Sequence, residues 1–201
     1  MFVHLNNRAL IGVYGSDAEA FLQNQLSNDI NKLDISSVQL NAYCQHQGKI
    51  LSLFWVMRND KGFFLSFPLD LLDSIKSRLQ MFVIMSDVVI EDITTEYIQV
   101  GSIGEAHQGA LIINDKLSVI ITDKEDINKF NMGSKDDWDM ACIDSLLPEI
   151  YSITSEKLVP QMLNLDINEF GVNFSKGCYP GQEVVARLHY LGSAKRRLFA
   201  F

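Results

Sequence analysis

The sequence predicts an α+β fold in which antiparallel strands and helices pack around a core. Strand-like and helix-like segments are mixed, without the strict strand–helix–strand alternation of a doubly wound sheet. The 201 residues are 47% hydrophobic and 21% charged, which is ample for a packed core and excludes a disordered chain. The chain has no internal repeat, low-complexity tract or linker-like stretch. We therefore expect one large domain or two small ones.

The first hundred residues predict six strands and two helices. Ser16 and Glu19 have the spacing of a capping box, so a helix is expected to begin there and to run to about Asp29. Pro68 can open the second helix, since apolar residues follow it at intervals of three and four. Gly48 lies in the connection between two strands and is free to adopt a positive φ. The strands are expected at residues 9–15, 38–44, 50–57, 63–67, 87–93 and 96–101.

The second half predicts fewer regular elements. Strands are expected at residues 110–113 and 117–122, and a helix at residues 136–147 that Pro148 ends. Residues 158–175 have no clean period and are expected to form a long, ordered loop. A short helix at 181–191 and the start of a strand at 196–201 complete the prediction.

The charge is acidic overall but unevenly distributed. The net charge is −8 and the isoelectric point is near 4.9, so the chain has no general attraction to phosphate backbones or anionic lipid. Residues 176–201 nevertheless hold five Lys or Arg and one Glu, a local charge of about +4. The cations Lys195, Arg196 and Arg197 are expected to form a solvated turn before the last strand.

Three cysteines, at positions 44, 142 and 178, indicate the compartment. An odd number without a C-x-x-C spacing makes a disulfide framework or a self-sufficient zinc site unlikely to form and favours a reducing compartment. The first residues lack a secretory signal, and no apolar run approaches the ~18–20 residues of a membrane helix. We therefore expect a cytoplasmic protein that contacts neither membrane nor nucleic acid directly.

The segment with the clearest chemical content is residues 171–187. Cys178 precedes a helix opened by Pro180 and Gly181, and the positive end of the helix dipole favours a thiolate there. Lys176 is near in sequence and adds positive charge, while Gln182 and Glu183 fall in the first helical turn. The alternative is that Cys178 is a small buried hydrophobe and that the glycines merely shape a turn.

The same segment resembles the signature of a known family. Residues 176–183 read K-G-C-Y-P-G-Q-E and residues 185–187 read V-A-R, which is similar to the motif of the YgfZ family, folate-binding relatives of the glycine-cleavage T-protein. Further similarity lies at residues 12–29, at Q-G-K-I over 47–50, and at P-Q and N-L over 160–165. Together the resemblance spans about residues 8–201.

The resemblance implies a T-protein-like fold around an opening that holds a folate. It implies a folate-binding domain over residues 1–192 and the start of a C-terminal β-barrel over 193–201, so that the barrel is absent or only begun. Cys178 and Lys176 are the implied reactive residues, with Gln182 and Glu183 beside the cofactor.

Two further folate-binding residues are implied. Trp138 occupies the place of a family tryptophan and is either a stacking face for the pterin or simply core. Arg8 stands where some members have a second tryptophan. It either stacks on the pterin or pairs with a folate carboxylate, or it is a surface arginine.

For function, the resemblance implies a folate-binding accessory protein in iron–sulfur cluster assembly or repair, which affects tRNA modification through iron–sulfur enzymes. The implied cofactor is tetrahydrofolate or a derivative. The implied partners are iron–sulfur assembly proteins or client iron–sulfur enzymes, and the chain itself is expected to be a monomer. The alternatives are a tetrahydrofolate-dependent aminomethyltransferase with Asp70 or Asp73 as acid/base, and a fragment that folds but no longer binds. Cys44 and His46 are interpreted as structural and surface residues, not metal ligands.

Overall fold

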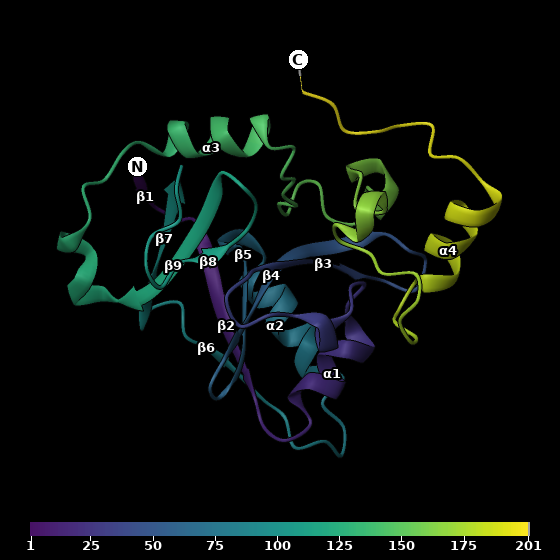
Figure 1. Ribbon diagram of the computed structural model, residues 1–201. Helices are drawn as coiled ribbons and strands as arrows, with labels where there is room; N and C mark the ends of the chain where they lie inside the picture. The colour runs from purple at the N-terminus through teal and green to yellow at the C-terminus, as the bar shows by residue number, and fades with distance from the viewer. Residues whose placement is uncertain (201) are drawn as a thin grey trace.

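Two antiparallel sheets form the framework of the computed structural model, which describes residues 1–200 (Figure 1). The larger sheet has the strand order β3-β4-β5-β2-β6, and the smaller has the order β1-β7-β9-β8. The strands are β1 (Phe2–His4), β2 (Arg8–Tyr14), β3 (Gln39–Cys44), β4 (Ile50–Asn59), β5 (Gly62–Pro68), β6 (Val89–Asp92), β7 (Tyr97–Ile103), β8 (Leu111–Ile112) and β9 (Leu117–Asp123).

Four α-helices accompany the sheets. Helix α3 contacts β1 and β7 of the smaller sheet, while α4 follows a long loop far along the chain (Figure 1). Among residues 1–200, no helix is long and apolar enough to cross a membrane. The helices are α1 (Ala18–Gln25), α2 (Leu72–Met81), α3 (Lys135–Asp144) and α4 (Gln182–Leu191).

The core is centred on the larger sheet. Strand β4 is buried on both faces from Ile50 to Met57, which matches its nearly continuous apolar sequence. Its neighbours β3 and β5 pair with it along most of its length. This arrangement makes β4 a rigid element, and Trp55 at its centre is only 1% exposed.

The predicted α+β class is confirmed, and most predicted elements form within two or three residues of their expected bounds. The turn between β3 and β4 has Gly48 at a φ of 75°, as predicted. Strand β1 was not predicted. It is only three residues long and forms because β7 pairs with it, which local sequence does not reveal.

The predicted start of the first helix is wrong in detail. The N-cap is Asp17, with no side-chain cap bond, and α1 ends at Gln25 rather than near Asp29. The Ser16 hydroxyl instead donates to the Asp87 carboxylate at 2.9 Å, and Glu19 pairs with Arg58 at 3.0 Å. Tertiary partners therefore displace the capping box. A true capping box does occur elsewhere, at the start of α3.

The predicted terminal strand is also wrong for residues 196–200, and Phe201 lies outside the described residues. The backbone of residues 196–200 is instead held by side-chain contacts. Asn164 Nδ2 donates to the carbonyl of Leu198 at 2.7 Å, and Arg197 forms a two-pronged ion pair with Asp166. Arg197 is therefore anchored, contrary to the expected solvated turn. The division at residue 192 stays a prediction.

The loop predicted at residues 158–175 is ordered and contains two short 3-10 turns, η4 (Pro160–Leu163) and η5 (Ile167–Glu169). Gly171 and Val172 both donate their N–H groups to the Leu165 carbonyl, at 2.9 and 3.0 Å. The loop then runs into the segment that carries Cys178. The loop thereby determines the position of the Cys178 segment relative to the sheets.

Candidate functional site

Arg8 lies at the first residue of β2 and is buried, with only 4% exposed. Its guanidinium carbon lies 3.5 Å from the ring centroid of Trp55, and its Nε donates to Ser66 Oγ at 2.7 Å. A further guanidinium nitrogen forms an ion pair with Glu149. The interpretation of Arg8 as a surface arginine is therefore wrong, because its side chain is buried against these three partners.

The burial of Arg8 also sets its charge state. Desolvation lowers the pKa of its guanidinium to about 9, which still leaves it protonated at neutral pH. A charged group in this environment needs partners, and Glu149 together with Ser66 supplies them. The flat guanidinium and the indole of Trp55 stack as a cation–π pair. Arg8 thus holds Trp55 in place.

Trp138 joins the same cluster from α3. Its indole is 5% exposed and meets the Trp55 ring edge-on, with centroids 6.1 Å apart. Gly101 of β7 lies directly beneath it, since a Cβ at that glycine would stand 2.4 Å from the Trp138 ring. Trp138 is therefore a buried core residue, and its role as a stacking face for a pterin stays a prediction.

Arg8 and Trp138 line one hollow of about 320 Å³, although they are far apart in sequence. Trp138, Ile143 and Leu147 give the lining its apolar part, and the other residues supply an amide, a guanidinium, a phenol, a thiol and two carboxylates. The Cys142 thiol has its pKa raised to about 12 by burial, so it is not a nucleophile at neutral pH. The lining residues are Asn7, Arg8, Trp138, Asp139, Cys142, Ile143, Leu147, Glu149 and Tyr151.

The segment around Cys178 is pressed against the turn between β3 and β4 through two glycines. Gly181, the N-cap of α4, has a φ of 83°, and a Cβ there would lie 2.4 Å from the Gln45 carbonyl oxygen. The same Cβ would lie 2.8 Å from the Cα of Gly48. Only glycine permits both the left-handed conformation and this approach. The contact brings the β3–β4 turn beside the start of α4.

Lys176 points away from the solvent and toward the end of α1. Its ammonium donates to the carbonyls of Gln23 and Leu26 at 2.5 Å each and of Asn28 at 3.0 Å. The Gln23 carbonyl lies in the last turn of α1, where carbonyls lack helical partners, and those of Leu26 and Asn28 follow just after it. A cation there also suits the helix dipole. Burial lowers the pKa of Lys176 to about 8. The contacts make Lys176 a tie between the Cys178 segment and α1.

Cys178 is exposed, so it is not the buried hydrophobe of the alternative interpretation. It lines a hollow of about 390 Å³ that also includes His46, Gln182 and Glu183. Gln182 and Glu183 therefore lie with Cys178 at the start of α4 and line a different hollow from Arg8 and Trp138. In the described part of the chain, no group of three His, Cys, Asp or Glu side chains could hold a metal ion.

The comparisons with known proteins identify the family. The chain is 34% identical, over its whole length and 72% of the relative, to an uncharacterized protein of Haemophilus influenzae. It is 29% identical to the tRNA-modifying protein YgfZ of Colwellia psychrerythraea, covering 98% of this chain and 70% of the relative. The corresponding protein of Klebsiella pneumoniae is 28% identical over 97% of this chain and 69% of the relative. The chain belongs to the YgfZ family.

The chain was also compared with family models and with solved structures. No family model matches the chain. Among solved structures, the glycine cleavage system aminomethyltransferase T of Bartonella henselae is similar over 50% of this chain and 27% of that protein, at 17% identity and a TM-score of 0.45.

Sequence reasoning missed two residues of the Arg8 cluster in this YgfZ-family chain. They are Trp55 and Glu149, to which no sequence motif assigns a role. A nearly continuous apolar strand gives no sign that one of its residues will stack on a distant arginine. The one available signal was a buried-strand arginine, Arg8, which requires an acidic partner somewhere in the chain.

Proposed function

We propose that this protein is a folate-binding accessory protein of iron–sulfur cluster assembly or repair, and that it influences tRNA modification through iron–sulfur enzymes. The observation that carries the proposal is the convergence of Arg8 and Trp138 on one hollow, with both side chains packed against Trp55 behind it. Relatives of the same family are named tRNA-modifying proteins. The iron–sulfur assembly proteins or client enzymes are its proposed partners, and its proposed location is the cytoplasm.

The hollow suits a tetrahydrofolate or a derivative. Trp138 and Leu147 offer apolar surface for a flat ring, and the Asn7 amide and Tyr151 hydroxyl offer hydrogen bonds at its edge. Arg8 contributes by holding Trp55, on which Trp138 packs. A bound folate would supply a carrier for one-carbon units, and these residues would orient it.

The proposed functional thiol is Cys178. Its exposure, and its position beside the first turn of α4, are those of an accessible thiol near a helix N-terminus. Lys176 supports the segment from behind through the carbonyls at the end of α1. We propose that Gln182 and Glu183 border the place where the thiol meets its partner.

The aminomethyltransferase alternative needs a carboxylate at the reactive nitrogen of the pterin. Asp70 accepts a hydrogen bond from the Ser152 N–H at 2.9 Å, and Asp73 is exposed on α2. Neither of them lines the hollow shared by Arg8 and Trp138. We therefore place the accessory role first.

Folate binding is tested by titrating tetrahydrofolate while following tryptophan fluorescence. We expect a saturable change in the wild type and at least tenfold weaker binding in Trp138→Phe, which keeps an aromatic ring but shortens the wall. N-Acetyltryptophanamide controls for absorption by the ligand. An absence of saturable change in the wild type would remove the folate part of the proposal.

The thiol is tested in a strain that lacks its own family member. Cys178→Ser should fail to restore the activity of iron–sulfur enzymes, while Cys44→Ala, which removes a buried thiol that lines neither hollow, should restore it. If both variants restore activity equally, the role proposed for Cys178 is wrong.

A further inference from the structure

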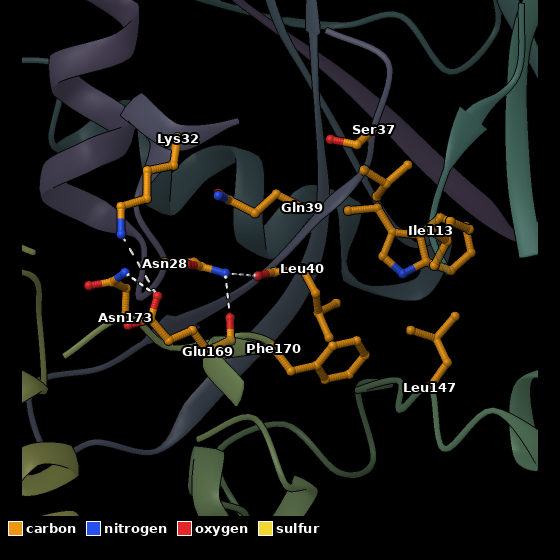
Figure 2. A pocket seen from close by; sticks show the side chains of 12 residues that line it. Asn28, Lys32, Ser37, Gln39, Leu40, Ile113, Leu147, Glu169, Phe170 and Asn173 are labelled. Atoms are coloured by element: carbon orange, nitrogen blue, oxygen red, sulfur yellow. Dashed lines mark hydrogen bonds and ion pairs between the residues drawn. The ribbon is translucent and has the colours of Figure 1, made fainter. Parts of the chain in front are cut away.

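The two edge strands of the larger sheet, β3 and β6, are covered to different degrees. Along β3, the Ser27 N–H donates to the Ala42 carbonyl at 3.1 Å. The Asn28 amide donates to the Leu40 carbonyl of the same strand, also at 3.1 Å (Figure 2). The segment after α1 therefore occupies much of the β3 edge. Strand β6 pairs with β2 on one side, and on its other side no strand of the described residues pairs with it.

Two residues of β6 direct their backbone groups away from the sheet. The Ile93 N–H, just after the strand, donates to the Leu10 carbonyl of β2 at 3.0 Å. Because successive residues of a strand direct their backbone groups to opposite sides, those of Ile90 and Asp92 point away from β2. Within residues 1–200, no group outside β2 forms a hydrogen bond with them. Such a row of unpaired N–H and C=O groups is a template for another extended chain.

The chain around this edge is acidic. Residues 79–104 hold four Asp or Glu and no Lys or Arg. Glu91, Asp92 and Glu96 are exposed, and within residues 1–200 none of them forms an ion pair. Two copies of β6 lying side by side would bring these carboxylates together, and like charges opposite each other on paired strands are destabilising. The edge therefore disfavours a second copy of this chain and favours a basic segment.

The face of the sheet beside this edge is aromatic. Val89 pairs with Tyr14 across the two strands, so their side chains share a face. Burial raises the pKa of the Tyr14 phenol, and the neighbouring Tyr97 raises it further. The Glu91 and Glu96 carboxylates raise it as well, so these groups lie near one another. Aromatic rings next to carboxylates suit the side chain of a Lys or Arg.

An exposed apolar loop leads directly into β6. Ile84 is 71% exposed and Met85 is fully exposed, while Val89 at the start of the strand is 49% exposed. These side chains lie at one end of the acidic edge. A partner segment would therefore find apolar surface next to the place where its basic residues pair.

We propose that β6 is a docking edge for an extended segment of a partner protein, which adds to the five strands of the larger sheet as a sixth. The segment carries Lys or Arg opposite Glu91 and Asp92, with apolar residues on either side of them. Backbone hydrogen bonds to Ile90 and Asp92 supply affinity, and the carboxylates select a basic sequence. This edge is distinct from the hollows at Trp138 and Cys178, and docking there needs neither folate nor the thiol.

The test uses the full chain and a fluorescein-labelled peptide, T-V-K-R-V-T, followed by fluorescence anisotropy at low salt. The charge-reversed peptide T-V-E-E-V-T is the ligand control. The double variant Glu91→Gln/Asp92→Asn removes two charges and preserves the size of both side chains. Glu105→Gln/Asp115→Asn is the matched control, because it removes the same charges from exposed residues at the end of β7 that lies away from β6.

We expect saturable binding of the basic peptide and none of the acidic one. Glu91→Gln/Asp92→Asn should bind the basic peptide at least about fivefold more weakly, since two cross-strand charge pairs are lost. The control double variant should bind it as tightly as the wild type. The proposal is overturned if the basic peptide gives no saturable signal, if the acidic peptide binds equally well, or if both double variants weaken binding to the same extent.

Two N-methylated forms of the basic peptide test the strand pairing itself. One is methylated at its odd-numbered backbone nitrogens and the other at its even-numbered ones, so each loses the N–H groups along one edge. We expect one form to lose binding and the other to retain it. If both forms bind as tightly as the parent peptide, the segment does not add as a strand and the proposal is wrong.

Discussion

Substitutions of Arg8 and Glu149, which form a buried ion pair, are expected to have strongly non-additive effects on the free energy of unfolding. The Arg8 side chain is 2% exposed and the Glu149 side chain 19% exposed. Replacing Arg8 by Met leaves a mostly buried carboxylate without its cation and removes the stack on Trp55. Replacing Glu149 by Leu leaves a buried guanidinium with only Ser66 and Trp55 as partners.

The magnitude follows from the burial of the pair. Breaking a buried ion pair by removing one partner lowers the free energy of unfolding by about 3–5 kcal/mol. Since Glu149 keeps some contact with solvent, Arg8→Met should lie near the lower end of this range. For a chain of this size each kcal/mol shifts the melting temperature by about 2–4 °C, so a decrease of at least roughly 6 °C is expected.

The double variant Arg8→Met/Glu149→Leu separates pairing from packing. Apolar residues of similar volume often replace a buried pair with little loss, so the double variant should lose no more than about 2 kcal/mol. The coupling energy between the two positions should therefore exceed about 2 kcal/mol, as for other residues in direct contact.

The assay is urea unfolding of the wild type, both single variants and the double variant, followed by circular dichroism. Circular dichroism is preferred because fluorescence would respond directly to the changed environment of Trp55. If the double variant loses the sum of the two single losses, the pair is not coupled and the account of Arg8 is wrong.

Three further predictions concern the segment around Cys178. Gly181→Ala should lower the free energy of unfolding by about 2 kcal/mol or more in a urea melt, because the new Cβ adds a steric clash to the strain of a left-handed φ. Gly104 has a φ of 102° but open space around its Cβ, so Gly104→Ala should lose only the free energy that comes from backbone strain. Equal losses in the two variants would rule out the close approach at Gly181. Burial lowers the pKa of Lys176 to about 8, below its ordinary value near 10.5, so between these pH values the unfolded chain binds more protons than the folded protein. The free energy of unfolding should therefore rise with pH from 8 toward 10, and Lys176→Met should weaken that rise. Iodoacetamide at pH 8 should modify Cys178 first, since burial raises the pKa of the other two thiols to about 12, and mass spectrometry showing prior modification of either would contradict this.

The candidate site was only partly predictable from the sequence. The Cys178 segment is contiguous, so its motif and the helix that follows it could be recognised locally, and α4 forms as expected. The role of Lys176 could not, because its carbonyl partners lie 148 to 153 residues earlier in the chain. The same holds for Arg8, whose burial the sequence leaves open because its partners Glu149 and Trp55 come from distant segments.

By itself, the sequence determined the class of fold, the positions of most strands and helices, and the family. These properties are carried by local periodicity, by turn residues such as Gly48 and by one contiguous motif. Tertiary structure alone decided which side chains meet: Arg8 with Trp55, Trp138 with Gly101, and Lys176 with the end of α1. The physical reason is that a charge or an indole can be buried only where packing supplies partners for it. Packing brings together residues that are far apart in the chain, and the sequence around each one does not indicate which distant residue it will contact.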